Sequence, residues 1–192
     1  MTAPLRELIA QCIERAKSFI PSKSSRVRTF PAGPFDQGVP TLEPGIFRQP
    51  SPQIRERFEL FGRWEWATHG HWLSVDDLQA LWDDERAHQD KFLSRVRIES
   101  LGMDEGGWSD SAPTLFKPSR LTLFAASDLD YQCVFLLWFE SEDEPEVWAY
   151  DSNGESRYKD LAGYLRAYLD SDTSASQRHR WKLAEIERHG VK

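Results

Sequence analysis

The stretch Ser119–Asp151, SRLTLFAASDLDYQCVFLLWFESEDEPEVWAYD, decides the fold of this chain. It contains three short apolar runs, Leu121–Ala126, Tyr131–Phe139 and Val147–Tyr150. Ser127-Asp128 follows the first run, and the acidic run Glu140–Glu146 follows the second. Apolar runs of this length between polar turn signals predict an antiparallel meander.

The middle run, Cys133–Phe139, barely alternates between apolar and polar residues. This pattern indicates a central strand that is covered on both faces, although a buried helix could show the same pattern. The β-branched and aromatic content of the run, and its shortness, favour a strand. A sheet covered on two faces needs further layers, and helical patterns on either side of the stretch can supply at least one.

Length, charge and cysteine content restrict the class of protein. With 192 residues the chain has room for one good-sized core. Its net charge of -7 argues against nucleic-acid binding, which requires a basic face. Cys12 and Cys133 lie among apolar residues, a pattern typical of a reducing compartment, although one disulfide stays possible. The charged N-terminus is unlike a signal peptide, and no apolar run approaches the roughly 18 residues of a membrane span, so we expect a cytoplasmic protein.

Helical patterns surround the meander. Apolar residues recur at helical spacing from Leu5 to Ile20, and Ser51-Pro52 begins a second helix that Gly62 closes. Ser74-Val-Asp-Asp77 resembles a capping box and predicts one helix that carries Leu78, Leu81, Trp82 and Phe92. The remaining expected segments are a Pro-rich segment 21–50 that wraps the core, a loop over 101–118, a helix over 161–169, and a tail helix over 174–189. We therefore expect a single domain over residues 1–170 with its core at about 50–170, followed by a helical tail, 171–192.

Two histidine patterns raise the question of metal binding. His69 and His71 could bind a metal together with Asp76 or Asp77, but His-Gly-His is equally typical of a turn, and no third ligand is evident. The chain also lacks a nucleophile elbow, a phosphate-binding loop and the common zinc motifs. Cys133 lies within an apolar run, where burial makes a thiol inert. The expectation is therefore no metal, no cofactor and no catalytic residue, with a small metal-dependent hydrolase that uses His69 and His71 as the alternative.

The carboxylates at the turns of the meander are the stronger candidates for function. They either form solvated turns or meet a basic protein. The predicted partner contacts are Asp128, Asp130, Glu142, Asp143 and Glu144, with Trp148 as an aromatic anchor. A tryptophan in an apolar run is also a normal core residue, so Trp148 has two interpretations.

The order of these motifs resembles the SUKH superfamily, which includes bacterial immunity proteins and a yeast regulator of cell-wall synthesis. Leu121–Asp128, Tyr131–Phe139, Glu146–Asp151 and Leu161–Leu169 are similar to the strands and helix of its C-terminal half. Upstream, Pro52–Gly62 stands where the family has a Pro-led helix, and Trp72–Leu81 resembles its strand followed by a Ser/Asp-rich helix start. The match covers residues 50 to 170. Leu129-Asp130-Tyr131 departs from the Gly-Asp that the family often has, and segments 21–50 and 171–192 lie outside the family pattern.

The resemblance implies an α+β fold, with a bent antiparallel sheet of four to six strands flanked by helices. It also implies a non-catalytic protein-binding module, an immunity protein that neutralises a cognate bacterial toxin by occluding its active site. The acidic balance suits a basic nuclease as that toxin, or another effector, and neither nucleic acid nor a membrane is expected as a partner. An intracellular adaptor whose tail helix docks elsewhere is a further alternative.

Overall fold

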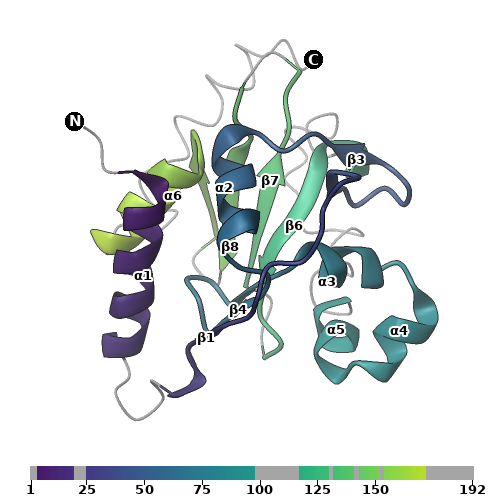
Figure 1. Ribbon diagram of the computed structural model, residues 1–192, viewed down its shortest axis with the longest axis horizontal. Helices are drawn as coiled ribbons and strands as arrows, with labels where there is room; N and C mark the ends of the chain where they lie inside the picture. The colour runs from purple at the N-terminus through teal and green to yellow at the C-terminus, as the bar shows by residue number, and fades with distance from the viewer. Residues whose placement is uncertain are drawn as a thin grey trace.

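The computed structural model describes residues 4–19, 25–97, 117–129, 132–140, 143–151 and 154–171 (Figure 1). The helices within these ranges are α1 (Leu5–Phe19), α2 (Pro52–Leu60), α3 (Val75–Ala80), α4 (Asp84–Gln89), α5 (Lys91–Val96), the short 3-10 helix η4 (Pro118–Arg120) and α6 (Leu161–Leu169). The strands are β1 (Arg28–Thr29), β2 (Val39–Pro40), β3 (Phe47–Arg48), β4 (Trp64–Glu65), β5 (His71–Trp72), β6 (Leu121–Ala126), β7 (Cys133–Leu137), β8 (Glu146–Asp151) and β9 (Gly154–Tyr158). The expected tail helix and most of the expected loop 101–118 lie outside the described residues.

The main sheet has seven antiparallel strands in the order β1-β4-β5-β6-β7-β8-β9. Its centre is the predicted meander of β6, β7 and β8, and every residue of β7 is buried, as expected for a strand covered on both faces. The α+β class is therefore confirmed. The predicted strand number of four to six is too low, because β1, β4 and β5 contain only two residues each and give no alternating pattern to recognise. A separate two-stranded sheet pairs β2 with β3.

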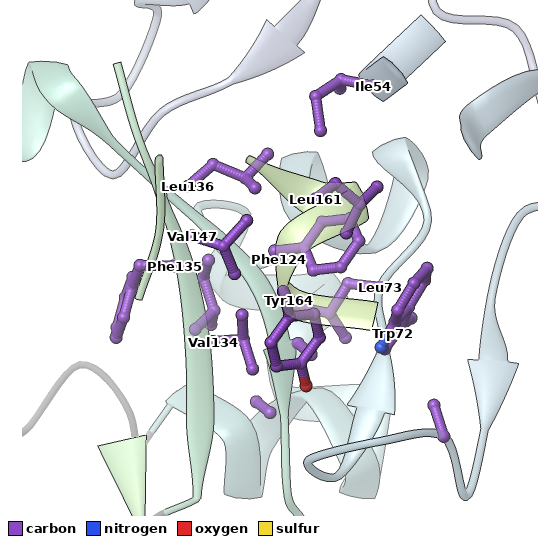
Figure 2. Close-up of a cluster of buried hydrophobic side chains, with 14 of the residues drawn as sticks. Ile54, Trp72, Leu73, Phe124, Val134, Phe135, Leu136, Val147, Leu161 and Tyr164 are labelled. Atoms are coloured by element: carbon purple, nitrogen blue, oxygen red, sulfur yellow. The ribbon is translucent and has the colours of Figure 1, made fainter. Parts of the chain in front are cut away.

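Helices α1, α2 and α6 form a layer on one face of the sheet (Figure 1). Within this layer α1 packs on α2 and α6, and α6 lies against β8 and β9. Figure 2 shows Val134 and Leu136 of β7 on the same side as Leu161 and Tyr164 of α6, with Phe135 on the opposite side of the strand. This alternation places successive residues of β7 in two different layers, which is why the run reads as apolar throughout.

The predicted helix after Ser74 is divided into three short helices. The capping box is present: the Ser74 side chain accepts from the backbone N–H of Asp77, and the Asp77 side chain accepts from that of Ser74. Asp83 and Asp90 then cap α4 and α5, since each carboxylate accepts two backbone N–H groups of the next turn. Each aspartate therefore starts a new helix, which the hydrophobic spacing alone did not predict.

The Pro-rich segment, which is described from residue 25, is bonded to the rest of the chain. Leu42 N donates to Leu121 O at 2.8 Å, and Thr122 Oγ1 donates to Pro40 O at 2.7 Å. The role expected of Gly62 was wrong: α2 ends at Leu60, and its C-cap Phe61 already has extended backbone, so no glycine cap is needed there. A Cβ at Gly62 would lie 2.6 Å from the Pro31 carbonyl oxygen. Gly62 therefore permits the close approach of the wrapping segment.

A buried arginine ties the end of α2 to the sheet. The Arg57 guanidinium is fully buried and donates to Phe61 O at 3.2 Å and Leu73 O at 2.8 Å. Its carbon lies 4.1 Å from the centroid of the Phe58 ring. Burial lowers the pKa of Arg57 to about 9, because the charged form loses its water.

Candidate functional site

The turn that follows β6 holds one of the predicted contact residues, Asp128. Asp128 Oδ1 lies 3.2 Å from His71 Nε2, and the Asp128 carbonyl accepts from Arg95 Nη1 at 3.1 Å. Within the turn, Leu129 N donates to Ser127 Oγ at 3.1 Å. The Leu129 side chain is 66% exposed, the highest value among the large hydrophobic side chains of the described residues. We call Ser127–Leu129 the first turn; it is braced by a strand and a helix and presents one apolar side chain to solvent.

His71 connects the first turn to the β4–β5 hairpin. Its Nδ1 lies 3.3 Å from the backbone N–H of Trp66, which can only donate. Nδ1 therefore accepts, and the proton of a neutral ring sits on Nε2, facing the Asp128 carboxylate. The Phe92 ring of α5 packs edge-on against His71 with 5.0 Å between centroids. His71 is buried at this position, so its role is to join β5, α5 and the first turn.

His69 points into a different environment from His71. His69 Nδ1 lies 2.7 Å from the Tyr164 hydroxyl, which is also bonded to Thr68 Oγ1. Trp72 Nε1 donates to the same Thr68 oxygen at 2.9 Å. Because Tyr164 is fully buried, a chain of this kind fixes the core rather than meeting a substrate.

The two histidines therefore have separate partners. In the ranges that the structure describes, no three His, Cys, Asp or Glu side chains are grouped so that they could hold a metal ion. Cys12 and Cys133 are both buried free thiols, and burial raises the pKa of each to about 12. Neither thiol is a nucleophile near neutral pH, as expected for Cys133.

The acidic turn between β7 and β8 holds three more predicted contacts, Glu142, Asp143 and Glu144, and three of its four described carboxylates bond within the molecule. Glu140 pairs with Arg48 at 2.9 Å. Glu144 accepts from the Ser51 hydroxyl and, at 2.9 Å, from the Gln53 backbone N–H, so it caps the start of α2. Glu146 is buried and pairs with Arg157 of β9. We call residues 140–146 the second turn; residues 141 and 142 lie outside the described residues, and Glu146 is also the first residue of β8. The carboxylates of Glu140, Glu144 and Glu146 bond to β3, to the start of α2 and to β9.

The other predicted contacts divide into three groups. Asp143 is exposed on the second turn and is available to a partner. Asp130 and Glu142 lie outside the described residues. Trp148 is 2% exposed and packs beneath the Arg157 guanidinium, which lies 5.2 Å from its ring centroid. This position fits the core interpretation of Trp148 and leaves no surface for an anchor.

The sequence analysis did not predict the ion pairs that join Arg63 to Asp77 of α3 and to Asp90 at the start of α5, which we call the ionic frame. Arg63 donates through Nε to Asp77 Oδ2 at 3.0 Å and through Nη2 to the second carboxylate oxygen, and Asp90 lies 3.8 Å away. Burial acts to raise the pKa of Asp77, but the hydrogen bond and charge of Arg63 and the bonds from Ser74 outweigh it and hold the pKa below its ordinary value. A groove of about 490 Å³ opens beside this pair, also lined by Asp76, Arg86 and Lys91. The Ser74 capping box was the one sequence signal for this frame.

No protein-family model, curated protein or solved structure matches this chain. None of the helices in the described ranges has both the length and the apolar character that crossing a membrane requires. What the described residues define is an α+β protein with a seven-stranded antiparallel sheet, two braced turns on its central strands, and histidines bonded within the fold.

Proposed function

We propose that this protein is a non-catalytic protein-binding module, an immunity protein that neutralises a cognate toxin by covering its active site. The observation that carries the proposal is the first turn, where Leu129 is 66% exposed, Arg95 and Ser127 bond to the backbone, and His71 contacts the Asp128 carboxylate. Covering Leu129 with a partner would remove apolar surface from water, and the bonds that already hold the backbone of the turn limit the conformational entropy lost on binding. The resemblance to SUKH immunity proteins supports the same function.

The chemistry of the described residues supports binding over catalysis. His69 bonds to the buried Tyr164 hydroxyl, and His71 bonds to Asp128 and the Trp66 backbone. A general base needs access to a substrate proton, and a metal ligand needs neighbouring ligands. These contacts give no support to the metal-dependent hydrolase that uses His69 and His71. The adaptor alternative depends on the tail 171–192, of which all but Ser171 is outside the described residues.

Binding to a basic toxin through carboxylates has less support than binding to a partner through the apolar side chain of Leu129. Glu140 and Glu144 are bonded to Arg48 and to the start of α2, so their charges are partly neutralised within the molecule. Asp143 keeps an exposed carboxylate. A basic nuclease therefore stays a candidate partner through Asp143, while the first turn supplies an apolar contact that does not depend on the sign of the partner's charge.

The test is co-expression with the product of the adjacent open reading frame. We expect a stable complex on size-exclusion chromatography, and growth protection when this protein accompanies its neighbour. Absence of both complex and protection would contradict the immunity function. Stoichiometric zinc or manganese in the purified protein, lost with His69→Ala and His71→Ala, would favour the hydrolase instead.

A further inference from the structure

The two buried histidines differ in what happens when the ring takes up a proton. Each has a carboxylate oxygen beside Nε2, Asp128 Oδ1 at 3.2 Å from His71 and Asp151 Oδ2 at 3.6 Å from His69. The Nδ1 atoms face different groups, a backbone N–H at His71 and a hydroxyl at His69. The group that faces Nδ1 therefore decides which ring can be protonated without losing a hydrogen bond.

The hydroxyl that faces His69 can reverse the direction of its hydrogen bond. The Tyr164 hydroxyl lies between His69 Nδ1 and Thr68 Oγ1 and is bonded to both. It donates to Nδ1 and accepts from Thr68 when the ring is neutral, and it accepts from Nδ1–H and donates to Thr68 when the ring is protonated. Both arrangements keep the two bonds, so protonation of His69 leaves this part of the core connected.

The backbone group that faces His71 has no such freedom. The Trp66 nitrogen lies 3.3 Å from His71 Nδ1, and its N–H can only donate. A protonated ring carries a proton on both nitrogens, so the Trp66 N–H and Nδ1–H become two donors that repel each other. The Nε2–H bond to Asp128 is kept and becomes charge-assisted. Protonation of His71 therefore strengthens its bond to the first turn and breaks its bond to the β4–β5 hairpin.

The residue released by this change has a strained backbone. Trp66 has a φ of 54°, in the left-handed region that bulky residues rarely adopt. Such a conformation costs free energy and persists where surrounding contacts hold it. The ring of Trp66 lies edge-on to His71 with 5.9 Å between centroids, and the next residue, Ala67, donates from its N–H to the Gly70 carbonyl at 2.9 Å. Loss of the bond to Nδ1 removes one restraint from this strained residue, so we expect the hairpin to loosen at Trp66.

Charged groups approach His71 from the elements packed around it. The Asp128 carboxylate contacts the ring directly. Three guanidinium groups lie one step further out: Arg26 over the Trp66 ring, Arg63 over the Phe92 ring, and Arg95 on the Asp128 carbonyl. The carboxylates that pair with Arg63 are those of Glu65, Asp77 and Asp90. The charge that a protonated His71 meets first is therefore Asp128, which keeps Nε2 in place while Nδ1 loses its partner.

We infer that His71 is a pH-sensitive switch: its neutral ring joins the Trp66 backbone to the first turn, and protonation of the ring releases that backbone while the bond to Asp128 is kept. His69 has a carboxylate beside it as well but lacks the switch, because its hydroxyl partner reverses. The inference does not rest on the proposed function, since every measurement below is made on the chain alone.

The test is NMR of the full chain labelled with 15N, between about pH 8 and about pH 5, where an imidazole ordinarily changes charge. Near pH 8, the ring nitrogen shifts of His71 should show the neutral tautomer with its proton on Nε2. As the ring takes up its second proton, the protection of the Trp66 amide against exchange with solvent should fall by about tenfold or more, with the same midpoint. The amides of β7 should keep their protection.

His71→Asn supplies the decisive variant, because its side-chain oxygen is an acceptor that gains no proton in this range. Protection of the Trp66 amide should then stay constant with pH. His69→Asn is the matched control, in which the response of Trp66 should persist. Thermal melting checks that each variant keeps its fold, and the unchanged chain decides the inference even where a variant does not.

Four outcomes would overturn the inference. The first is a neutral His71 with its proton on Nδ1, and the second is a His71 that does not titrate by about pH 5. The third is a titration that leaves Trp66 protected or that His71→Asn fails to abolish in the amide of Trp66. The fourth is a loss of protection shared equally by β7, which reports unfolding of the whole sheet rather than release of the hairpin.

Discussion

The two turns of the central meander both carry carboxylates and have opposite roles. The first turn, Ser127–Leu129, is fixed by His71 and Arg95 and presents Leu129 to solvent. The second turn, residues 140–146, directs Glu140, Glu144 and Glu146 to partners on β3, α2 and β9. A run of carboxylates at a turn therefore does not by itself mark a binding surface. What lies across from each carboxylate decides whether it meets solvent, a partner or its own chain.

The difference arises from the elements that each turn approaches. The second turn meets the backbone N–H groups at the start of α2 and the guanidinium groups of Arg48 and Arg157, all of which attract carboxylates. The first turn meets β5 and α5, where a histidine and an arginine bond to Asp128 and leave its neighbour Leu129 outside. Five sets of substitutions sharpen or break this contrast.

The largest effect is expected at the innermost carboxylate of the second turn. Glu146→Ala removes the carboxylate that pairs with Arg157, and both side chains are nearly inaccessible, at 4% and 1% exposure. Leaving the buried guanidinium without this partner should lower the free energy of unfolding by about 3–5 kcal/mol, measured by urea denaturation with tryptophan fluorescence. The double replacement Glu146→Leu with Arg157→Met should recover most of the loss. A single variant as stable as the unchanged protein would refute the inward role of this turn.

The next largest effect is expected where β5 supports the first turn through the contact between His71 and Asp128. Gly70 has a φ of +72°, and a Cβ there would lie 2.4 Å from the carbonyl carbon and oxygen of Ala126. Gly70→Ala should therefore push β5 away from β6, disturb the His71–Asp128 contact and cost about 3 kcal/mol. Gly33→Ala is the matched control, because a Cβ at Gly33 meets nothing within 4 Å. Equal melting temperatures for the two variants would show that the brace tolerates displacement.

The ion pair between Arg63 and Asp77 should make the free energy of unfolding depend on pH. The folded pKa of Asp77 lies below its ordinary value of 3.8, mainly because Arg63 outweighs the effect of burial. As the pH falls, Asp77 is therefore protonated in the unfolded chain before it is protonated in the folded protein. The stabilisation from ionised Asp77 is present above about pH 4 and is lost as the pH falls through the folded pKa.

Asp77→Asn should cost about 2 kcal/mol at neutral pH and reduce the loss of stability below pH 4. Urea denaturation at a series of pH values measures both effects. Asp76→Asn is the control, because Asp76 is exposed and pairs with the exposed Arg86. If Asp77→Asn lost as much stability below pH 4 as the unchanged protein does, the role given to Arg63 would be contradicted.

Smaller effects are expected from removing two other carboxylates of the second turn, those of Glu144 and Glu140. Glu144→Ala removes the acceptor of Ser51 and of the Gln53 N–H and should cost about 1.5 kcal/mol. Glu140→Ala should cost less than about 0.5 kcal/mol, because Glu140 is 78% exposed. Thermal denaturation of both variants under one buffer gives the difference, and equal losses would contradict a capping role for Glu144.

The contribution of Glu144 to the free energy of unfolding should depend on pH with the opposite sign to that of Asp77. Burial raises the pKa of Glu144 above its ordinary value of 4.5, despite the bonds from Ser51 and Gln53. The folded protein therefore keeps this proton longer, and the associated stabilisation is lost as the pH rises through the raised pKa. Glu144→Gln should remove that loss, measured as a flatter stability profile just above pH 4.5.

Much of the fold was predictable from local patterns. The strands β6, β7 and β8, the helices α1, α2 and α6, and the Ser74 capping box follow from periodicity and cap chemistry. A strand at Trp72 was expected from the family resemblance, and β1 and the bounds of β4 were not predicted, because two residues carry no period. The division of the expected helix at Asp83 and Asp90 was also missed, since a helix-capping aspartate and a surface aspartate look alike in sequence.

The candidate site was less predictable than the fold. Asp128 was predicted as a contact residue and does lie on the first turn, but Leu129, Trp66 and Arg95 were not singled out. They are separated by tens of residues in sequence and meet only through the His71–Asp128 pair. Glu144 was predicted as a contact residue, and the structure places it at the start of α2. Trp148 had two interpretations, anchor or core, and its burial fits the core one.

The amino-acid sequence by itself determined the central meander and the helices that cover it, because apolar spacing and turn residues act over neighbouring positions. The direction in which each polar side chain points was decided by tertiary structure alone. Carboxylates bond to whichever donors the packed elements bring within about 3 Å, and that geometry depends on segments far apart in the chain. This is why one acidic turn fastens the molecule while the other leaves a leucine in water.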